Sequence, residues 1–193
     1  MGREALDDLS RRRRDREANS AFYQVLGRVK SIRSSELKVG DLVKVNQNQR
    51  VPADIVLLRT EDKTGEAFVR TDQLDGETDW KLKLAMSVTQ NMSDDEILQK
   101  GSITLTAEPP TKEIQRMSGT LSTESQSYGV GIDNVMWANT VLASGPYIIG
   151  VVVYTGCETR QAQNTSRARV KTGLLEHEIN QLSKVIAILV KLI

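Results

Sequence analysis

The side chains most able to do chemistry are concentrated in Thr71-Asp72-Gln73-Leu74-Asp75-Gly76-Glu77-Thr78-Asp79, where four carboxylates fall within eight positions. A carboxylate such as Glu77 can orient and deprotonate a water molecule, and the neighbouring Gly76 lets a bulky reacting group approach the backbone closely. Thr78 could hold Glu77 in place or donate a hydrogen bond to a phosphoryl oxygen. The segment is therefore a candidate for activating water.

Two other interpretations of this segment stay open. The pair Asp75-Gly76 is a strong hairpin signal, because glycine tolerates positive φ and aspartate bonds its own backbone, so the segment could be only a β-turn. A calcium-binding loop is the third interpretation. The spacing does not fit the usual helix-loop-helix site, which has alternating acids, glycine in sixth place and a distant glutamate.

The rest of the sequence does not complete a catalytic site. It contains no Gly-x-x-x-x-Gly-Lys-Ser/Thr phosphate loop and no obvious nucleophile paired with a base. The single histidine, His177, lies in a charged helical setting typical of a surface, and one histidine excludes a multi-histidine metal site. We therefore expect no metal site and no bound cofactor in this chain, and any remaining part of a catalytic site must come from elsewhere.

Composition narrows the class of protein. The 193 residues suit one domain, and with 39% hydrophobic but only 4% aromatic residues the core must consist mainly of Val, Ile, Leu and Ala. A net charge of +1, from 26 basic and 25 acidic residues, provides no long-range field that would hold nucleic acid. The single cysteine, Cys157, excludes an internal disulfide and favours a reducing compartment.

The pattern of residue types predicts a β-rich body between two helices. Residues 1–20 read as a charged helix, and residues 21–172 read mainly as strands. In the helix, Arg11–Arg14 form either a solvated face or a patch for phosphate or lipid headgroups. Residues 173–193 read as a helix that becomes solidly apolar over Leu182–Ile193. That stretch is shorter than the about 20 residues of a membrane span, so it is either a packed helix or the stub of a truncated span.

Within the predicted body, Val51–Leu58 is more uniformly apolar than the stretches before it and should be a strand buried on both faces, and Tyr147–Tyr154 should be another strand. Residues 87–127 read as variable and loop-rich. There, Ser93 is expected to cap a short helix over Asp94–Gln99, and a strand is expected at Ile103–Ala107. The Ser, Thr and Gly content of 118–127 predicts a mobile surface loop.

Asp75-Gly76-Glu77-Thr78 resembles the signature loop of the actuator domain in type IV P-type ATPases, the phospholipid flippases. Cation pumps carry Thr-Gly-Glu-Ser at the equivalent place, so Asp75 and Thr78 indicate the lipid branch. The resemblance covers most of the chain and is weakest at 87–127. Its other parts are Val39-Gly40-Asp41-Leu42-Val43-Lys44-Val45, Val51-Pro52-Ala53-Asp54, Thr71-Asp72-Gln73-Leu74, Trp80-Lys81-Leu82-Lys83, Asn134 to Ala143, Val151-Val152-Val153-Tyr154-Thr155-Gly156 with Glu158-Thr159, and 161–184.

A subgroup is also indicated. Asn48-Gln49-Arg50 replaces the Gly-Asp or Gly-Glu that is usual before the Pro-Ala-Asp strand. Together with Arg11–Arg14 and Asp72-Gln73, this resembles the flippases of endosomes and the Golgi that act without an accessory subunit. The resemblance thus implies the cytosolic face of an integral membrane protein, with endosomal or Golgi membranes as its place.

The resemblance implies a mechanism and a fold. In this family another domain carries an aspartate that ATP phosphorylates, and the actuator places its loop over the aspartyl phosphate. Glu77 would then activate the hydrolytic water, Gly76 would permit close approach, and Asp75 and Thr78 would shape the loop. The implied fold is mainly β (α+β), a distorted antiparallel jelly roll with peripheral helices at both ends that connect to the membrane part.

The implied cofactors, ATP and Mg²⁺, belong to the full-length enzyme, as does the phospholipid substrate. The implied partners are the phosphorylation and nucleotide-binding domains and the membrane helices of the same chain, and the isolated chain is expected to be monomeric and inactive. Two alternatives remain: the actuator of a cation-transporting pump, and a non-catalytic β-rich interaction domain. A free-standing hydrolase is disfavoured because nucleophile and nucleotide motifs are missing.

Overall fold

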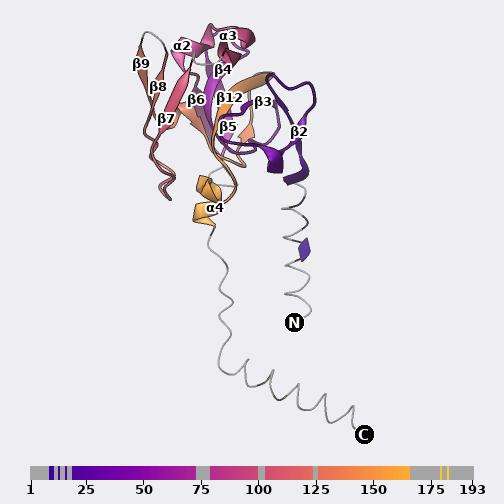
Figure 1. Ribbon diagram of the computed structural model, residues 1–193. Helices are drawn as coiled ribbons and strands as arrows, with labels where there is room; N and C mark the ends of the chain where they lie inside the picture. Colours follow the sequence, from indigo (N-terminus) through magenta and orange to yellow (C-terminus); the bar gives the residue numbers. More distant parts are fainter. Residues whose placement is uncertain are drawn as a thin grey trace.

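The computed structural model describes residues 19–72, 79–99, 103–123 and 126–165, together with Leu9, Ser10, Arg13, Arg16, Ile179 and Leu182. Every strand pairing among these residues is antiparallel, and the strands form three sheets with short helices at their edges (Figure 1). The predicted β-rich antiparallel class is confirmed. The isolated described positions in 1–20 and 173–193 are helical, while the predicted limits of these end segments stay a prediction.

The largest sheet has six strands in the order β10-β4-β12-β3-β1-β2. At its centre, β4 (Asp54–Thr60) and β12 (Tyr147–Tyr154) pair with each other and are almost entirely buried, as their apolar sequences predict. Glycine is favoured at position 150, because an added Cβ would lie 3.0 Å from the Val56 carbonyl oxygen and 2.8 Å from Ile55 Cδ1. The remaining strands are β10 (Val135–Met136), β3 (Leu42–Asn46), β1 (Phe22–Val25) and β2 (Ile32–Arg33).

The second sheet has the order β11-β5-β6 and the third has the order β7-β8-β9. The second sheet consists of β11 (Val141–Leu142), β5 (Glu66–Arg70) and β6 (Trp80–Leu84). The third sheet consists of β7 (Thr104–Ala107), β8 (Gly119–Ser122) and β9 (Ser127–Val130). The strand predicted at Ile103–Ala107 is therefore confirmed in β7.

The prediction of a mobile surface loop over 118–127 is wrong, because β8 and β9 form a hairpin there. Leu121 is fully buried and Val130 is 3% exposed, so apolar side chains at alternate positions fix the hairpin to the core. Serine, threonine and Gly129 occupy the outward positions, and threonine is itself favourable in strands. The content of serine, threonine and glycine suggested a loop, but the alternation of buried and exposed side chains specifies two strands.

The interior consists of two clusters of apolar side chains. One lies beneath β1, β3 and β5, and the other lies between the large sheet and the third sheet. The first includes Tyr23, Val25, Val43, Val45, Ile55, Leu57, Val69, Met136, Leu142 and Ile148. The second includes Val56, Leu58, Met86, Ile97, Met117, Leu121, Val130, Trp137, Val153 and Tyr154. The small share of aromatic residues in both clusters agrees with the composition.

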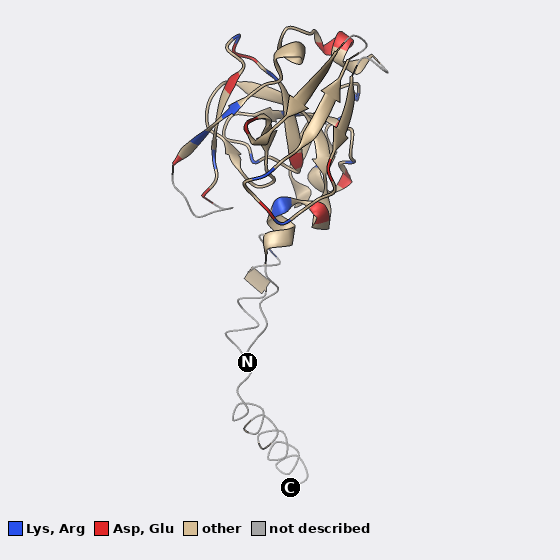
Figure 2. Cartoon of the chain, turned by 90° about the vertical axis from the view of Figure 1, so that its left-hand side faces the viewer, with Lys and Arg blue, Asp and Glu red and all other residues tan. Residues whose placement is uncertain are grey.

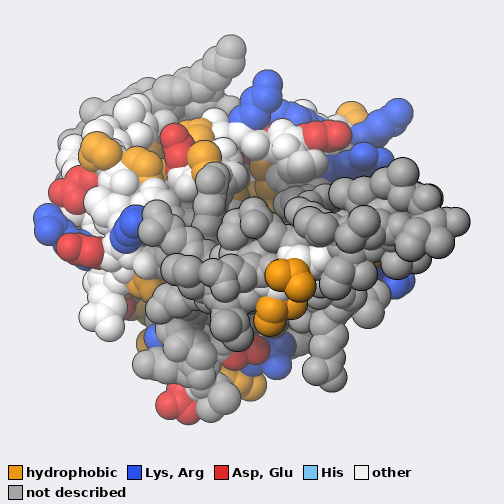
Figure 3. All heavy atoms as spheres, turned by 90° about the horizontal axis from the view of Figure 1, so that it is seen from below, with side chains coloured by type: hydrophobic (Ala, Val, Ile, Leu, Met, Phe, Trp, Pro, Cys, Tyr) orange, Lys and Arg blue, Asp and Glu red, His pale blue; other side chains and the backbone are white. Residues whose placement is uncertain are grey.

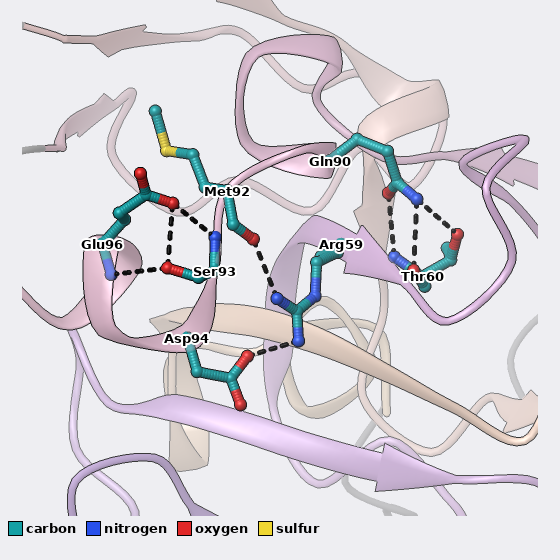
Figure 4. A network of polar contacts seen from close by, with 7 residues as sticks. All are labelled: Arg59, Thr60, Gln90, Met92, Ser93, Asp94 and Glu96. Carbon is teal, nitrogen blue, oxygen red and sulfur yellow. Dashed lines mark hydrogen bonds and ion pairs between the residues drawn. The ribbon is translucent and has the colours of Figure 1, made fainter.

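Short helices close one edge of the body. The helices α2 (Ser87–Gln90) and α3 (Asp94–Leu98) follow β6, and α3 begins at a capping box. The Ser93 amide donates to Glu96 Oε2 at 2.6 Å, and the Glu96 amide donates to Ser93 Oγ at 3.3 Å (Figure 4). The helix predicted after Ser93 is thereby confirmed, with its end at Leu98.

A polar network fastens these helices to β4. The Arg59 guanidinium donates to the Met92 carbonyl at 2.8 Å and forms an ion pair with Asp94 (Figure 4). The Thr60 amide donates to Gln90 Oε1 at 2.9 Å, and Gln90 Nε2 donates back to the Thr60 carbonyl at 3.1 Å. The side-chain amide thus continues the hydrogen bonding of β4 beyond its sheet.

The 3₁₀ turns η1 (Ser34–Glu36), η2 (Ile132–Asn134) and η3 (Gly156–Glu158) connect the strands, and η3 leads into helix α4 (Arg160–Asn164). Figure 1 shows that the described chain enters the β-body near β2 and leaves it through α4, both at the lower end of the view. Among the helices in the described part of the chain, none is long and apolar enough to cross a membrane. Charges of both signs are spread over the body (Figure 2), and they also occur together on the face seen from below (Figure 3).

Candidate functional site

The candidate loop is carried by a hairpin. Strands β5 and β6 pair along their whole length, and Arg70 at the end of β5 lies opposite Trp80 at the start of β6. Residues 71–79 therefore join two adjacent strand ends, which brings Asp72 and Asp79 to the same end of the hairpin. The predicted site residues Asp75, Gly76, Glu77 and Thr78 lie outside the described residues.

The β5 side of this hairpin is held firmly by its neighbours. Val69 and Ala67 are buried in the first apolar cluster, and Thr71, where the loop begins, is only 3% exposed. On the other side of β5, the Phe68 amide donates to Ser144 Oγ at 2.8 Å, and the Ala143 amide donates to the Phe68 carbonyl at 2.7 Å. One end of the candidate loop is thus fixed by the core.

The β6 side is held by a buried cation that sequence reasoning did not single out. Lys83 is 6% exposed, and its ammonium donates to the Ile132 carbonyl of η2 at 2.7 Å. Burial lowers the pKa of Lys83 to about 8, and the nearby carboxylate of Asp133 partly offsets that shift. Asn134 Nδ2 also donates to the Leu84 carbonyl at 3.0 Å, so η2 anchors β6 twice.

A second polar centre joins α4 to the body. Asp54, the last residue of the Val51-Pro52-Ala53-Asp54 block, is fully buried and accepts from the amides of Ala138 and Arg160, each at 2.7 Å. Burial raises the pKa of Asp54 to about 6, although the two amide donors and the Arg160 guanidinium act in the opposite direction. Asp54 therefore connects the first residue of β4 with the first residue of α4.

Arg160 completes this centre. Its guanidinium lies 5.0 Å from the ring centroid of Trp137 and 5.3 Å from that of Tyr154, and it donates to the Thr111 carbonyl at 2.6 Å. Cation–π contact with two rings makes up for part of the hydration that a buried cation loses. The centre is structural in character, since its members contact one another within the core and α4 is thereby fixed to the β-body.

One other stretch from the sequence analysis, Asn48-Gln49-Arg50, is structural in the same sense. Asn48 adopts a φ of 61° in the turn between β3 and β4, a left-handed conformation that asparagine tolerates better than most residues. Gln49 Nε2 donates to the Phe22 carbonyl at 3.1 Å, and Arg50 Nη1 donates to Asn139 Oδ1 at 2.7 Å. The turn is thus tied to β1 and to the residues before β11.

Metal ligands do not gather in the part of the chain that the structure describes, where no group of three or more His, Cys, Asp and Glu side chains could hold an ion. Cys157 is free and exposed. The loop carboxylate Glu77 and the histidine His177 lie outside that part, so the calcium interpretation of the loop stays untested.

These features and the sequence define a class of protein. Residues 16–169 match the model of the P-type ATPase actuator domain, and the chain belongs to that family. The phospholipid-transporting ATPase NEO1 of Saccharomyces cerevisiae is 52% identical to it over 187 residues, which are 96% of this chain and 16% of that protein. The probable phospholipid-transporting ATPase IIB of Homo sapiens is 47% identical over 191 residues, 95% of this chain and 16% of that protein.

A third relative, the probable phospholipid-transporting ATPase tat-5 of Caenorhabditis elegans, is 46% identical over 191 residues, 95% of this chain and 18% of that protein. The chain thus spans less than a fifth of the length of these curated relatives. The resemblance to actuator domains of the lipid branch, stated above from Asp75–Thr78 and its flanking strands, is confirmed.

Proposed function

We propose that this chain works as the actuator of an ATP-driven phospholipid-translocating P-type ATPase. Its loop would promote hydrolysis of an aspartyl phosphate carried by another domain. One observation carries the proposal: in a chain of the actuator family, the paired ends of β5 and β6 hold the segment that contains Asp75-Gly76-Glu77-Thr78. The names of the three relatives support a lipid rather than a cation as the transported substrate.

In this proposal Glu77 orients and deprotonates the water that attacks the aspartyl phosphate. Gly76 presents no side chain, so the phosphoryl group can come close to the backbone, while Asp75 and Thr78 shape the loop around it. A hydrolytic group works only when it is held in place, because a misplacement of about 1 Å can reduce the rate about a hundredfold. The buried Thr71 supplies that rigidity where the loop begins, and the anchored Lys83 holds strand β6, which carries the other end of the loop.

The other requirements of the reaction lie outside this chain. ATP and Mg²⁺ would bind to the phosphorylation and nucleotide-binding domains of the longer protein, and the phospholipid would bind among its membrane helices. The chain itself would face the cytosol at an endosomal or Golgi membrane, which is what the resemblance of the Asn48-Gln49-Arg50 turn to that subgroup implies.

Coupling would depend on the two connections to the membrane part. The described chain enters and leaves the β-body at the same end, and Asp54 and Arg160 fix the exit helix α4 to that body. A rotation of the body would therefore move α4 with it, and the segments beyond would transmit the movement to the membrane helices.

The test is the substitution Glu77→Gln in the full-length ATPase, followed by measuring the decay of its radiolabelled phosphoenzyme. We expect phosphoenzyme to form at the normal rate and to decay at least about a hundredfold more slowly, the scale of loss of general-base catalysis. The matched control is Asp72→Asn, which removes a charge from the exposed start of the same loop and should leave the decay unchanged. Normal decay in Glu77→Gln would show that the segment is only a turn.

The cation-pump alternative has a separate test. Turnover of the purified full-length enzyme should be stimulated by phospholipid and should not depend on a transported cation. Stimulation by a cation alone would reject the lipid branch and leave the actuator assignment intact.

A further inference from the structure

The loop between β1 and β2 carries an exposed serine that directly follows basic residues. Arg28, Val29, Lys30 and Ser31 are all exposed, and Val29 is fully so. In the described part of the chain, the Ser31 hydroxyl takes part in no side-chain hydrogen bond. An enzyme from solution can therefore reach this hydroxyl without displacing a partner.

The chain around Ser31 can be extended at little cost. Strand β2 lies at the edge of the six-stranded sheet and pairs with β1 only at Ile32 and Arg33. Edge segments with few contacts open locally with much less free energy than the core. Because Ile32 is only half-buried, release of β2 from β1 exposes little apolar surface.

The position of the cations relative to Ser31 is uncommon in this sequence. A lysine or arginine stands three positions before a serine or threonine at only two places, Arg28 before Ser31 and Arg169 before Thr172. Many Ser/Thr kinases select such substrates, because acidic side chains of the kinase bind the cations that precede the acceptor. Ser31 is exposed, while Thr172 lies outside the described residues.

Arg28 is available for such recognition. Its side chain is 43% exposed, and its guanidinium forms an ion pair with Asp41 at 3.0 Å. A surface ion pair of this kind contributes little to stability. A kinase with its own carboxylates can therefore draw Arg28 away from Asp41 without unfolding the body.

A phosphate on Ser31 would find cations nearby. Ser31 and Arg33 are exposed on either side of the half-buried Ile32, so the alternation of an extended chain directs both to the same side. The Arg33 guanidinium lies 5.9 Å from the ring centroid of Phe22, an exposed contact that is weaker than an ion pair with phosphate. Residues 28–38 contain one carboxylate, Glu36, and four cations, Arg28, Lys30, Arg33 and Lys38. The fold therefore accommodates the charge of about −2 that a phosphoserine carries at pH 7.

We propose that Ser31 is phosphorylated by a Ser/Thr protein kinase that selects basic residues before its acceptor. The hydroxyl oxygen of Ser31 forms a bond to the γ-phosphorus of ATP, and the bond from that phosphorus to the β,γ-bridging oxygen breaks. ADP leaves, and the hydroxyl proton passes to the catalytic base of the kinase. This modification lies beyond the proposed function and does not depend on it.

The same cations have a simpler role at the edge of the sheet. Lysine and arginine on an edge strand keep it from pairing with strands of other molecules, and that role needs charge but no hydroxyl. Arg28 and Arg33 would serve edge protection equally. Recognition by a kinase depends on Arg28, which precedes Ser31, more than on Arg33, which follows it.

The experiment incubates the purified full-length ATPase with ATP, Mg²⁺ and the catalytic subunit of cyclic-AMP-dependent protein kinase, which selects arginine before its acceptor. Cleavage after glutamate releases residues 18–36 as one peptide, and mass spectrometry locates the phosphate within it. We expect the phosphate on Ser31, and Ser31→Ala should remove it. Only serines of this peptide are scored, so an aspartyl phosphate formed by the ATPase itself does not interfere.

Arg28→Gln and Arg33→Gln form a matched pair of controls, since each removes one exposed cation from the same stretch of chain. Phosphorylation of Ser31 should be at least about tenfold slower in Arg28→Gln and unchanged in Arg33→Gln. A partly unfolded variant would present a more extended substrate to the kinase. A slower reaction therefore cannot be attributed to misfolding.

A synthetic peptide of residues 24–36 checks that the kinase accepts this sequence. Phosphorylation of the peptide but not of the folded ATPase would overturn the proposal, because the site would then be inaccessible. Absence of phosphate from both would overturn it as well. The same holds for phosphate found on Ser34, Ser35 or Thr172 in place of Ser31, and for equal rates in Arg28→Gln and Arg33→Gln.

Discussion

Asp54 connects two parts of the chain that are distant in sequence. Its carboxylate accepts from the amides of Ala138 and Arg160, which lie 84 and 106 positions further along the chain. Such a group cannot be assigned from local sequence, where Asp54 is simply the end of the Val51-Pro52-Ala53-Asp54 block. The sequence analysis missed Arg160 for the same reason, because the rings that Arg160 contacts, Trp137 and Tyr154, are not adjacent to it in the sequence.

The titration of Asp54 gives a prediction for stability. Its pKa is raised from the ordinary 3.8 to about 6, so in this interval the folded protein holds a proton that the unfolded chain has released. The contribution of Asp54 is therefore greatest at acid pH and is lost as the pH rises to about 6, by at most about 3 kcal/mol. Asn at this position does not titrate, so the stability advantage of the wild type over Asp54→Asn should shrink as the pH rises.

Urea unfolding of both proteins at a series of pH values from 4 to 7 measures this difference. Asp54→Asn should also be less stable at every pH, because its amide group can accept from only one of the two backbone amides. A stability difference that stays constant across the series would contradict the assignment of the raised pKa to Asp54.

Elements were predictable where their signal is local. The capping box of α3 is written in Ser93 and Glu96, and the buried strands β4 and β12 are visible as apolar runs. The β8–β9 hairpin was not recognised, because its Ser, Thr and Gly content concealed the alternation of Leu121 and Val130. The loop residues Asp75–Thr78 could be chosen as the catalytic candidate only through the family resemblance, since locally they also fit a turn.

The capping box provides the prediction at this scale. Ser93→Ala removes the acceptor for the Glu96 amide and should lower the free energy of unfolding by about 1 kcal/mol. The control Ser35→Ala changes an exposed serine in η1 and should alter stability by less than about 0.5 kcal/mol. Urea unfolding compares the two, and equal stabilities would mean that the cap contributes nothing beyond solvation.

At the scale of the whole molecule, the proposed function makes the chain one part of a catalytic cycle and makes its β-body the part that carries the loop. The β5–β6 hairpin holds the loop at one end of the second sheet. The Asp54–Arg160 centre holds α4, which lies near the end of the described segment 126–165. The sequence contains no phosphate-binding loop and no obvious nucleophile paired with a base. In the proposed function, the chemistry is therefore shared with other domains of a longer protein.

The purified chain alone should therefore show no ATP hydrolysis and no lipid transport. It has no phosphate-binding loop and no nucleophile paired with a base, and a loop that activates water has no effect without an aspartyl phosphate to attack. The measurement is phosphate release from ATP, with the Glu77→Gln chain purified in parallel. Equal background rates in both preparations indicate contaminating ATPases. Activity that is present in the wild-type chain and absent from Glu77→Gln would contradict the prediction, because it would place a complete hydrolytic site within these 193 residues.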